Sequence, residues 1–172
     1  VKWSDDGFPY ITQGNESLPL VQARSGVTRQ QELTFGNFDV KEEFNDSILG
    51  MQWMTLRGPA TDLYSLTETP GYLTLKCATK SSKERVVPAM VCRRLQHHQF
   101  EAETRMYFNP QCVDEKAGLL LFKDEFHQYF MAVAESEAGR TVSLIQIGRE
   151  EDSVLACEKV SSESTCFDLK VV

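Results

Sequence analysis

Hydrophobic and polar residues alternate with a period of two along much of the chain, and no stretch of helix length has a 3.6-residue period. Such alternation predicts β-strands with one buried and one solvated face, as antiparallel sheets have. The clearest segment is 100–108, where Glu101, Glu103, Arg105 and Tyr107 form the polar face. Further strands are expected at residues 72–77, 118–122, 129–133, 141–147, 154–160 and 166–172.

Short polar segments with turn residues separate the expected strands, for example Asn109-Pro110 and residues 148–152. Strands that recur at this spacing are typical of an antiparallel sandwich or barrel and not of βαβ units. We therefore predict an all-β fold, an antiparallel β-sandwich, with no helix longer than about two turns. The alternation predicts burial of Leu73, Leu75, Phe100, Ala102, Met106, Leu119, Leu121, Phe130, Val142 and Leu144.

The first 38 residues lack this regular pattern. Residues 1–12 hold a turn and one short strand-like segment, and residues 13–38 are rich in Gln, Ser, Gly, Asn and Arg, which is typical of a linker or strap. The sandwich is expected to span residues 39–172. Its last strand has no turn after it, and a free strand edge is a liability, so we expect the sandwich to be incomplete at its C-terminal end.

Composition narrows the function classes. The 172 residues have room for one domain, and 18 basic against 25 acidic residues give a net charge of -7. An acidic chain repels phosphate backbones, which argues against nucleic-acid binding, and no 18-residue apolar run predicts a membrane span. Val1 does not begin a signal peptide, so we expect a piece of a longer polypeptide, and the compartment stays open because any export signal would lie upstream.

Five widely spaced cysteines, without a CxxC pair, predict free thiols and argue against a disulfide framework or a zinc site. Hydrolysis of sugars needs two suitably placed carboxylates, and no recognisable pair is present. Glu101 and Glu103 are interpreted as a solvated strand face, and His97, His98 and His127 have no metal-ligand spacing. No phosphate loop or nucleophile elbow occurs. We predict no catalytic residue, no metal and no cofactor.

Aromatic residues are the remaining candidates for sugar contact. Trp53 lies in an alternating segment, which favours packing in the core. Phe126 interrupts the polar loop at residues 123–127. A large apolar residue at a hairpin tip is a candidate partner contact, and packing beneath its own loop is the alternative.

Several segments together resemble the C-terminal β-sandwich of glycoside hydrolase family 43 β-xylosidases. They occur in the order and at about the spacing of that family, and the likeness covers residues 44–134 and continues more weakly to the end. The N-terminal Trp3-Ser4-Asp5-Asp6-Gly7-Phe8-Pro9 is similar to the last strand of that family's five-bladed propeller. The segments are Phe44-Asn45-Asp46 with residues 49–53, residues 64–75, residues 93–104 and Ala117-Gly118-Leu119.

The resemblance implies a jelly-roll, concanavalin A-like sandwich for residues 39–172, and the last strand of a preceding β-propeller for residues 1–12. The family's catalytic acids lie in the propeller, so the resemblance implies a parent glycosidase and an inactive isolated chain. A loop of the family's sandwich places an aromatic side chain at the mouth of the active site. The corresponding loop here is 123–127, which makes Phe126 the expected substrate-binding residue.

Two functions that involve a carbohydrate remain open at this stage, beside a purely structural sandwich with no sugar contact. The first is an accessory domain of a hemicellulose-degrading enzyme, xylan 1,4-β-xylosidase-like, which packs on the catalytic β-propeller of the same polypeptide and shapes its pocket for a xylo-oligosaccharide or arabinosyl substrate. The alternative is an independent carbohydrate-binding or lectin-like module. A row of exposed aromatic residues on one sheet face would favour the second function, and the strand at 100–108 offers only Tyr107.

Overall fold

The computed structural model describes residues 2–12, 17, 20, 39–137 and 139–172, and these contain no helix. They belong to two units, Val1–Thr34 and Phe35–Val172. In the first unit, β1 (Lys2–Trp3) pairs antiparallel with β2 (Pro9–Tyr10). The expected linker at 13–38 lies outside the described residues except for positions 17 and 20, and the assignment of 1–12 to a propeller stays a prediction.

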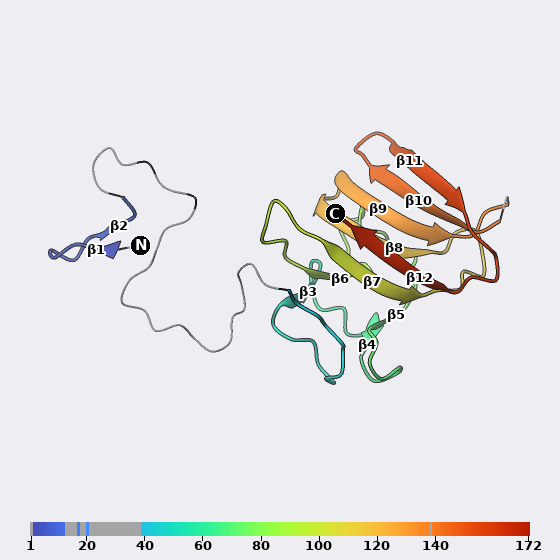
Figure 1. Ribbon diagram of the computed structural model, residues 1–172, viewed down its shortest axis with the longest axis horizontal. Helices are drawn as coiled ribbons and strands as arrows, with labels where there is room; N and C mark the ends of the chain where they lie inside the picture. Colours follow the sequence, from blue (N-terminus) through green and yellow to red (C-terminus); the bar gives the residue numbers. More distant parts are fainter. Residues whose placement is uncertain (1, 13–16, 18–19, 21–38, 138) are drawn as a thin grey trace. The chain divides into compact units, whose positions relative to one another are not determined.

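The larger unit is built on a four-stranded antiparallel meander (Figure 1). Its strands follow one another along the chain and match the expected alternating segments, and β10 has the expected bounds. A β-bulge at Leu144/Ile145 leaves Leu155 without a direct partner, because Leu144 pairs with Ala156 and Ile145 pairs with Val154. The four strands are β8 (Lys116–Asp124), β9 (His127–Ala134), β10 (Thr141–Ile147) and β11 (Asp152–Lys159).

A second layer lies over one face of the meander (Figure 1). It consists of β7 (Ala102–Tyr107) paired antiparallel with β12 (Cys166–Val171). Phe167 and Leu169 of β12 pack on Val133 of β9, and partly buried side chains from β7, β8 and β10 surround them. The two layers confirm the predicted all-β antiparallel sandwich.

Four short strands precede these layers. β3 (Trp53–Thr55) pairs with β6 (Val91–Arg93), and β4 (Tyr64–Ser65) pairs with β5 (Thr74–Leu75). The expected strand at 72–77 is therefore reduced to two residues. β4 and β6 were not predicted, since neither is long enough to show an alternation.

The predicted core is only partly correct. None of the ten residues is fully buried. Nine are partly buried, and Leu75 is 44% exposed. Alternation identifies the face of a strand, but full burial also needs a covering layer, and β5 is too short to receive one. The most enclosed apolar residues of the two layers are Ala132, Val133, Ile147, Phe167 and Leu169.

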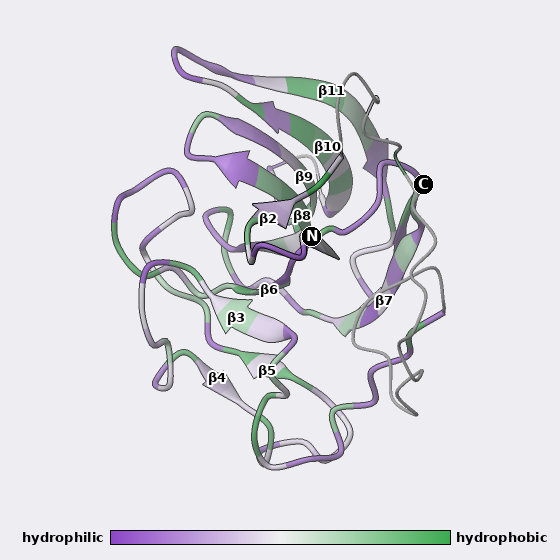
Figure 2. Cartoon of the chain, turned by 90° about the vertical axis from the view of Figure 1, so that its left-hand side faces the viewer, coloured by the Kyte–Doolittle hydropathy of each residue, from purple (hydrophilic) through white to green (hydrophobic). Residues whose placement is uncertain are grey.

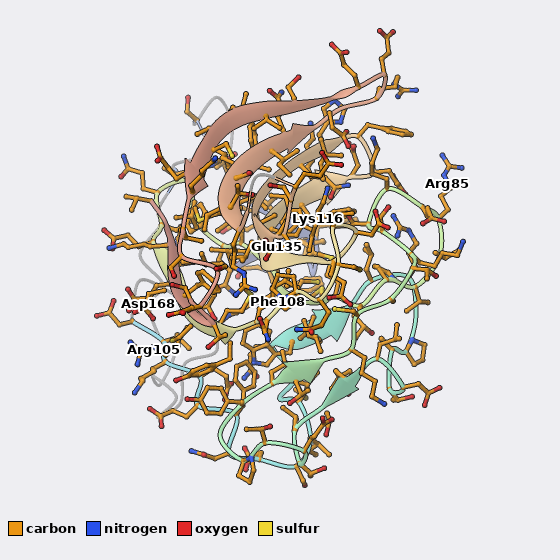
Figure 3. All side chains as sticks on the ribbon, turned by 90° about the vertical axis from the view of Figure 1, so that its right-hand side faces the viewer. Arg85, Arg105, Phe108, Lys116, Glu135 and Asp168 are labelled. Carbon is orange, nitrogen blue, oxygen red and sulfur yellow. The ribbon has the colours of Figure 1, made fainter. Side chains whose placement is uncertain are left out.

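Hydropathy follows the strands and turns of the meander, with apolar stretches in the middle of β10 and β11 and hydrophilic turns between the strands (Figure 2). The expected polar face of the segment 100–108 is confirmed at the surface, because Glu101, just before β7, pairs with Lys170. On β7 itself, Arg105 pairs with Asp168 of β12 (Figure 3). All five cysteines are free. No described helix is long and apolar enough to cross a membrane.

Candidate functional site

Phe126 lies in the two-residue turn between β8 and β9, where Asp124 and His127 are opposite each other. The Asp124 carboxylate closes this turn. Its Oδ1 accepts a hydrogen bond from the Phe126 backbone N–H at 2.9 Å and lies 2.7 Å from Nδ1 of His127. The pKa of the Asp124 carboxyl lies below its usual range, first because of the hydrogen bond from the Phe126 N–H and then because of the hydrogen bond with His127. The turn therefore has a defined backbone geometry.

Gln128 supports the turn from inside the domain. Its side chain is nearly inaccessible, with 1% relative exposure. Nε2 donates to the backbone carbonyl of Glu125 at 3.0 Å, and Oε1 accepts from the Ser82 hydroxyl at 2.6 Å. Because both ends of the amide are used, the buried polar group is satisfied. Gln128 thereby connects the turn to the loop between β5 and β6.

Arg57 joins the turn to the same loop from another side. Its Nη2 donates to Oε1 of Glu125 at 2.9 Å, and Nη1 donates to the Val86 carbonyl at 3.0 Å. A longer contact of 3.3 Å links Nη2 to the Ser82 carbonyl. The pKa of Glu125 lies below its usual range, first because the carboxylate accepts its own backbone N–H and then because of Arg57.

Arg149 covers part of the Phe126 ring. The guanidinium carbon lies 4.7 Å from the ring centroid, which is within the range of a cation–π contact. Arg149 belongs to the turn between β10 and β11. This turn lies at the same end of the meander as the Phe126 turn, because Ile147 of β10 pairs with Gln128 of β9. Phe126 is half-buried, and among the described residues Arg149 contacts its ring.

The β10–β11 turn is itself fixed to the β5–β6 loop. Lys83 Nζ lies 2.7 Å from Oδ1 of Asp152, and the backbone N–H of Gly148 donates to the same oxygen at 3.3 Å. Two hairpin turns and one long loop therefore meet at one end of the sandwich. Phe126 lies at this end, and polar and ionic contacts connect the segments around it.

Five described carboxyl groups have a shifted pKa. A glycosidase acid needs a raised pKa, so that it is protonated when the leaving group departs. Every described carboxyl group with a shifted pKa is shifted downward instead, because each accepts hydrogen bonds from backbone N–H groups, cations or indole. These groups are Glu42, Glu84, Asp124, Glu125 and Asp168. Among the described residues, no cluster of three or more His, Cys, Asp or Glu side chains is arranged to hold a metal ion.

Sequence reasoning selected Phe126 but missed its neighbours. Arg57 and Arg149 are distant from the turn in sequence, and nothing in the pattern around them indicated a contact. Gln128 did carry a signal, since a polar residue at a strand position that faces inward needs a partner. The other aromatic candidate, Trp53, lies elsewhere, where its indole N–H donates to Glu42 at 3.0 Å and its ring contacts Phe44.

Comparison with known proteins finds relatives that are named as β-xylosidases and arabinofuranosidases. It is 35% identical over 144 residues to the "Beta-xylosidase" of Bacillus subtilis (strain 168), a match that covers 83% of this chain and 26% of that protein. It is 28% identical over 149 residues to the "Non-reducing end alpha-L-arabinofuranosidase BoGH43B" of Bacteroides ovatus, covering 85% of this chain and 27% of that one. The chain spans 26% to 27% of the length of these curated relatives.

Solved structures share the fold. The crystal structure of xylan beta-1,4-xylosidase from Bacillus halodurans C-125 superimposes with a TM-score of 0.75 at 27% identity, covering 98% of this chain and 32% of that one. Residues 41–172 match the model of the beta-xylosidase C-terminal concanavalin A-like domain. Because this match covers most of the chain, the protein belongs to the family of C-terminal concanavalin A-like domains found in glycoside hydrolase family 43 β-xylosidases.

Proposed function

We propose that this chain is an accessory domain of a hemicellulose-degrading glycosidase, packs on the catalytic propeller of the same polypeptide and shapes the substrate pocket with its Phe126 turn. The observation that carries the proposal is the family match over residues 41–172. The names of the relatives favour terminal xylosyl or arabinofuranosyl linkages as the bonds that the parent enzyme cleaves.

The local chemistry agrees with a role in shape and not in proton transfer. The carboxylates beside Phe126 have lowered pKa values, so they stay ionised at neutral pH. The Phe126 ring is apolar and is held at a turn, and aromatic faces can stack on the C–H face of a sugar ring. Such a residue binds and orients a sugar without taking part in bond cleavage.

An independent sugar-binding module fits the structure less well. Such a module would need a flat row of exposed aromatic rings. Tyr107 on the outer face of β7 has one aromatic neighbour, Tyr72, and their rings meet edge to face at 76°. Within the described part of the chain, this pair does not form a flat stacking platform.

The test is a comparison of the 172-residue chain with a polypeptide that joins it to its catalytic domain. We expect the chain alone to release no product from aryl xylosides or aryl arabinofuranosides, and the joined polypeptide to do so. Turnover by the purified chain that disappears when one of its own carboxylates is replaced would contradict the accessory role. In the joined polypeptide, Phe126→Ala tests the pocket contact. An unchanged KM would reject that contact.

A further inference from the structure

We propose that Arg57 is a positioning residue that holds Phe126 at the edge of the substrate pocket. This inference rests on the proposed function of the Phe126 turn. Arg57 does not contact the ring; it binds Glu125, the residue before Phe126 in the turn. By fixing Glu125 against the β5–β6 loop, Arg57 restricts where the turn can place the neighbouring aromatic side chain.

The contacts of Arg57 join segments that are far apart in sequence. Its guanidinium reaches the Glu125 carboxylate and, 29 residues along the chain, the carbonyl of Val86. The Arg57 side chain is 19% exposed and that of Glu125 is 23% exposed. The pair is therefore more sheltered than the surface pair of Arg105 and Asp168, whose side chains are 59% and 69% exposed. Sheltered pairs with several hydrogen bonds are held more tightly than exposed ones.

The backbone of Arg57 supports the same conclusion. Its φ is 65°, in the left-handed region that side-chain-bearing residues rarely adopt. A residue is retained in such a conformation only where the surrounding contacts favour it. The conformation at Arg57 is compatible with a guanidinium that bonds both the turn and the loop. Asn tolerates this region better than most residues, so Arg57→Asn removes the guanidinium with little backbone strain.

Two supports of the turn act on different atoms. Gln128 binds the main-chain carbonyl of Glu125 from the buried side, whereas Arg57 binds its carboxylate from the loop side. Loss of Arg57 should therefore loosen the turn without opening the buried amide network. The fold should remain, and the position of Phe126 should become less defined.

The experiment uses the polypeptide that joins this chain to its catalytic domain, with xylobiose as the probe. Variants are Arg57→Asn, Arg57→Lys, Phe126→Ala and the double variant Arg57→Asn/Phe126→Ala, with Arg105→Asn as the matched control. We expect Phe126→Ala to raise KM about two- to tenfold with kcat unchanged, as for a lost binding contact. Arg57→Asn should also raise KM, and Arg57→Lys should raise KM less than Arg57→Asn does.

The double variant tests whether the effect of Arg57 on KM depends on the Phe126 ring. If Arg57 acts through Phe126, the double variant should have the KM of Phe126→Ala alone, because a removed ring cannot be mispositioned. Arg105→Asn should leave KM and kcat unchanged. Amide hydrogen exchange in the 172-residue chain provides a second measurement, and Arg57→Asn should speed exchange in residues 123–128 while the strands of the meander stay protected.

The outcomes separate the two proposals. A raised KM in Phe126→Ala with an unchanged KM in Arg57→Asn overturns the positioning role and leaves the pocket contact standing. An unchanged KM in Phe126→Ala rejects the pocket contact and with it the functional role of Arg57. Additive effects in the double variant also overturn positioning through Phe126. Unchanged exchange in residues 123–128 of Arg57→Asn shows that Arg57 does not hold the turn.

Discussion

The guanidinium of Arg140 lies 3.2 Å from the carboxylate of Glu135, and the Arg140 side chain is only 4% exposed. Arg140 also donates to the carbonyl of Ser164 at 2.5 Å and to the side-chain oxygen of Asn109 at 2.9 Å. These partners come from the end of β9, the β11–β12 loop and the β7–β8 loop. One buried cation therefore connects both layers of the sandwich at the end opposite the Phe126 turn.

Replacing this cation should destabilise the domain strongly. Arg140→Met keeps most of the side-chain volume but removes the buried guanidinium. The partly buried Ser164 carbonyl, the Asn109 side-chain oxygen and the Glu135 carboxylate then lose their donor. We expect the free energy of unfolding to fall by about 2–4 kcal/mol, since three hydrogen bonds of one charged group are lost together and each is worth more than a neutral one. Denaturant titration measures this change. Arg105→Met removes an exposed pair and should cost much less. Equal losses in the two variants would contradict the role of burial.

Gly118 of β8 should not accept a side chain. A Cβ at this position would overlap the Met131 carbonyl oxygen of β9, and a backbone atom inside a sheet cannot move without disturbing the register. We expect Gly118→Ala to lower the free energy of unfolding by about 1–3 kcal/mol, as for overpacked sites. The control is Gly50→Ala, whose close neighbours belong to the flexible end of the Gln52 side chain. A Gly118→Ala chain as stable as the Gly50→Ala chain would show that β8 can shift.

The Asp124 carboxylate predicts a pH dependence. Its pKa in the folded chain lies below its usual value, first because of the Phe126 backbone N–H and then because of His127. A lowered carboxyl pKa contributes stability that is complete above the usual pKa of about 4 and is lost as pH falls through the folded value. Stability should therefore decrease on acidification below about pH 4, and the decrease should be shallower in Asp124→Asn. The measurement is denaturant unfolding at a series of pH values between neutral and strongly acidic. Parallel curves for the two chains would rule out this carboxyl as a contributor.

Glu42 should hold two segments around Trp53. Its carboxylate accepts hydrogen bonds from the Phe44 backbone N–H at 3.0 Å, from Gln52 at 3.1 Å and from the Trp53 indole at 3.0 Å. Glu42→Gln replaces one acceptor oxygen with a donor, so we expect a loss of about 0.5–1.5 kcal/mol and a shift of the Trp53 fluorescence maximum. Glu43→Gln is the control, because the Glu43 carboxylate forms an ion pair with Lys41, whose side chain is exposed. Identical emission spectra in both variants would show that Glu42 does not position the indole.

The alternation of hydrophobic and polar residues was sufficient to predict the long strands. The expected bounds of β10 are the observed ones, since Thr141–Ile147 alternates and is flanked by turn residues. The same reasoning overestimated the strand at 72–77, because pairing with β4 ends after two residues. It gave no signal for β6 (Val91–Arg93), whose three residues lack an alternation. Strand length depends on the partner as well as on the segment itself.

The candidate site was less accessible to sequence reasoning. Phe126 is conspicuous because an apolar residue in a polar turn is unusual, and the family resemblance gave it a role. Arg57 could not be found in this way, since its partner Glu125 lies 68 residues further along the chain. Contacts at such separations follow from the way that loops meet in the folded domain. An isolated arginine in a sequence is most often a surface residue.

The meander has a consequence for the order of folding. Its strands are neighbours along the chain, so each hairpin closes only a short loop, whereas β7 and β12 bring Met106 opposite Phe167. Long loops cost more entropy to close, and contacts between distant residues tend to form late. We expect Leu119→Ala, in the meander, mainly to slow refolding, and Leu169→Ala, in β12, mainly to speed unfolding. Stopped-flow kinetics measure both rates, and a slower refolding rate for the β12 variant would place its pairing early.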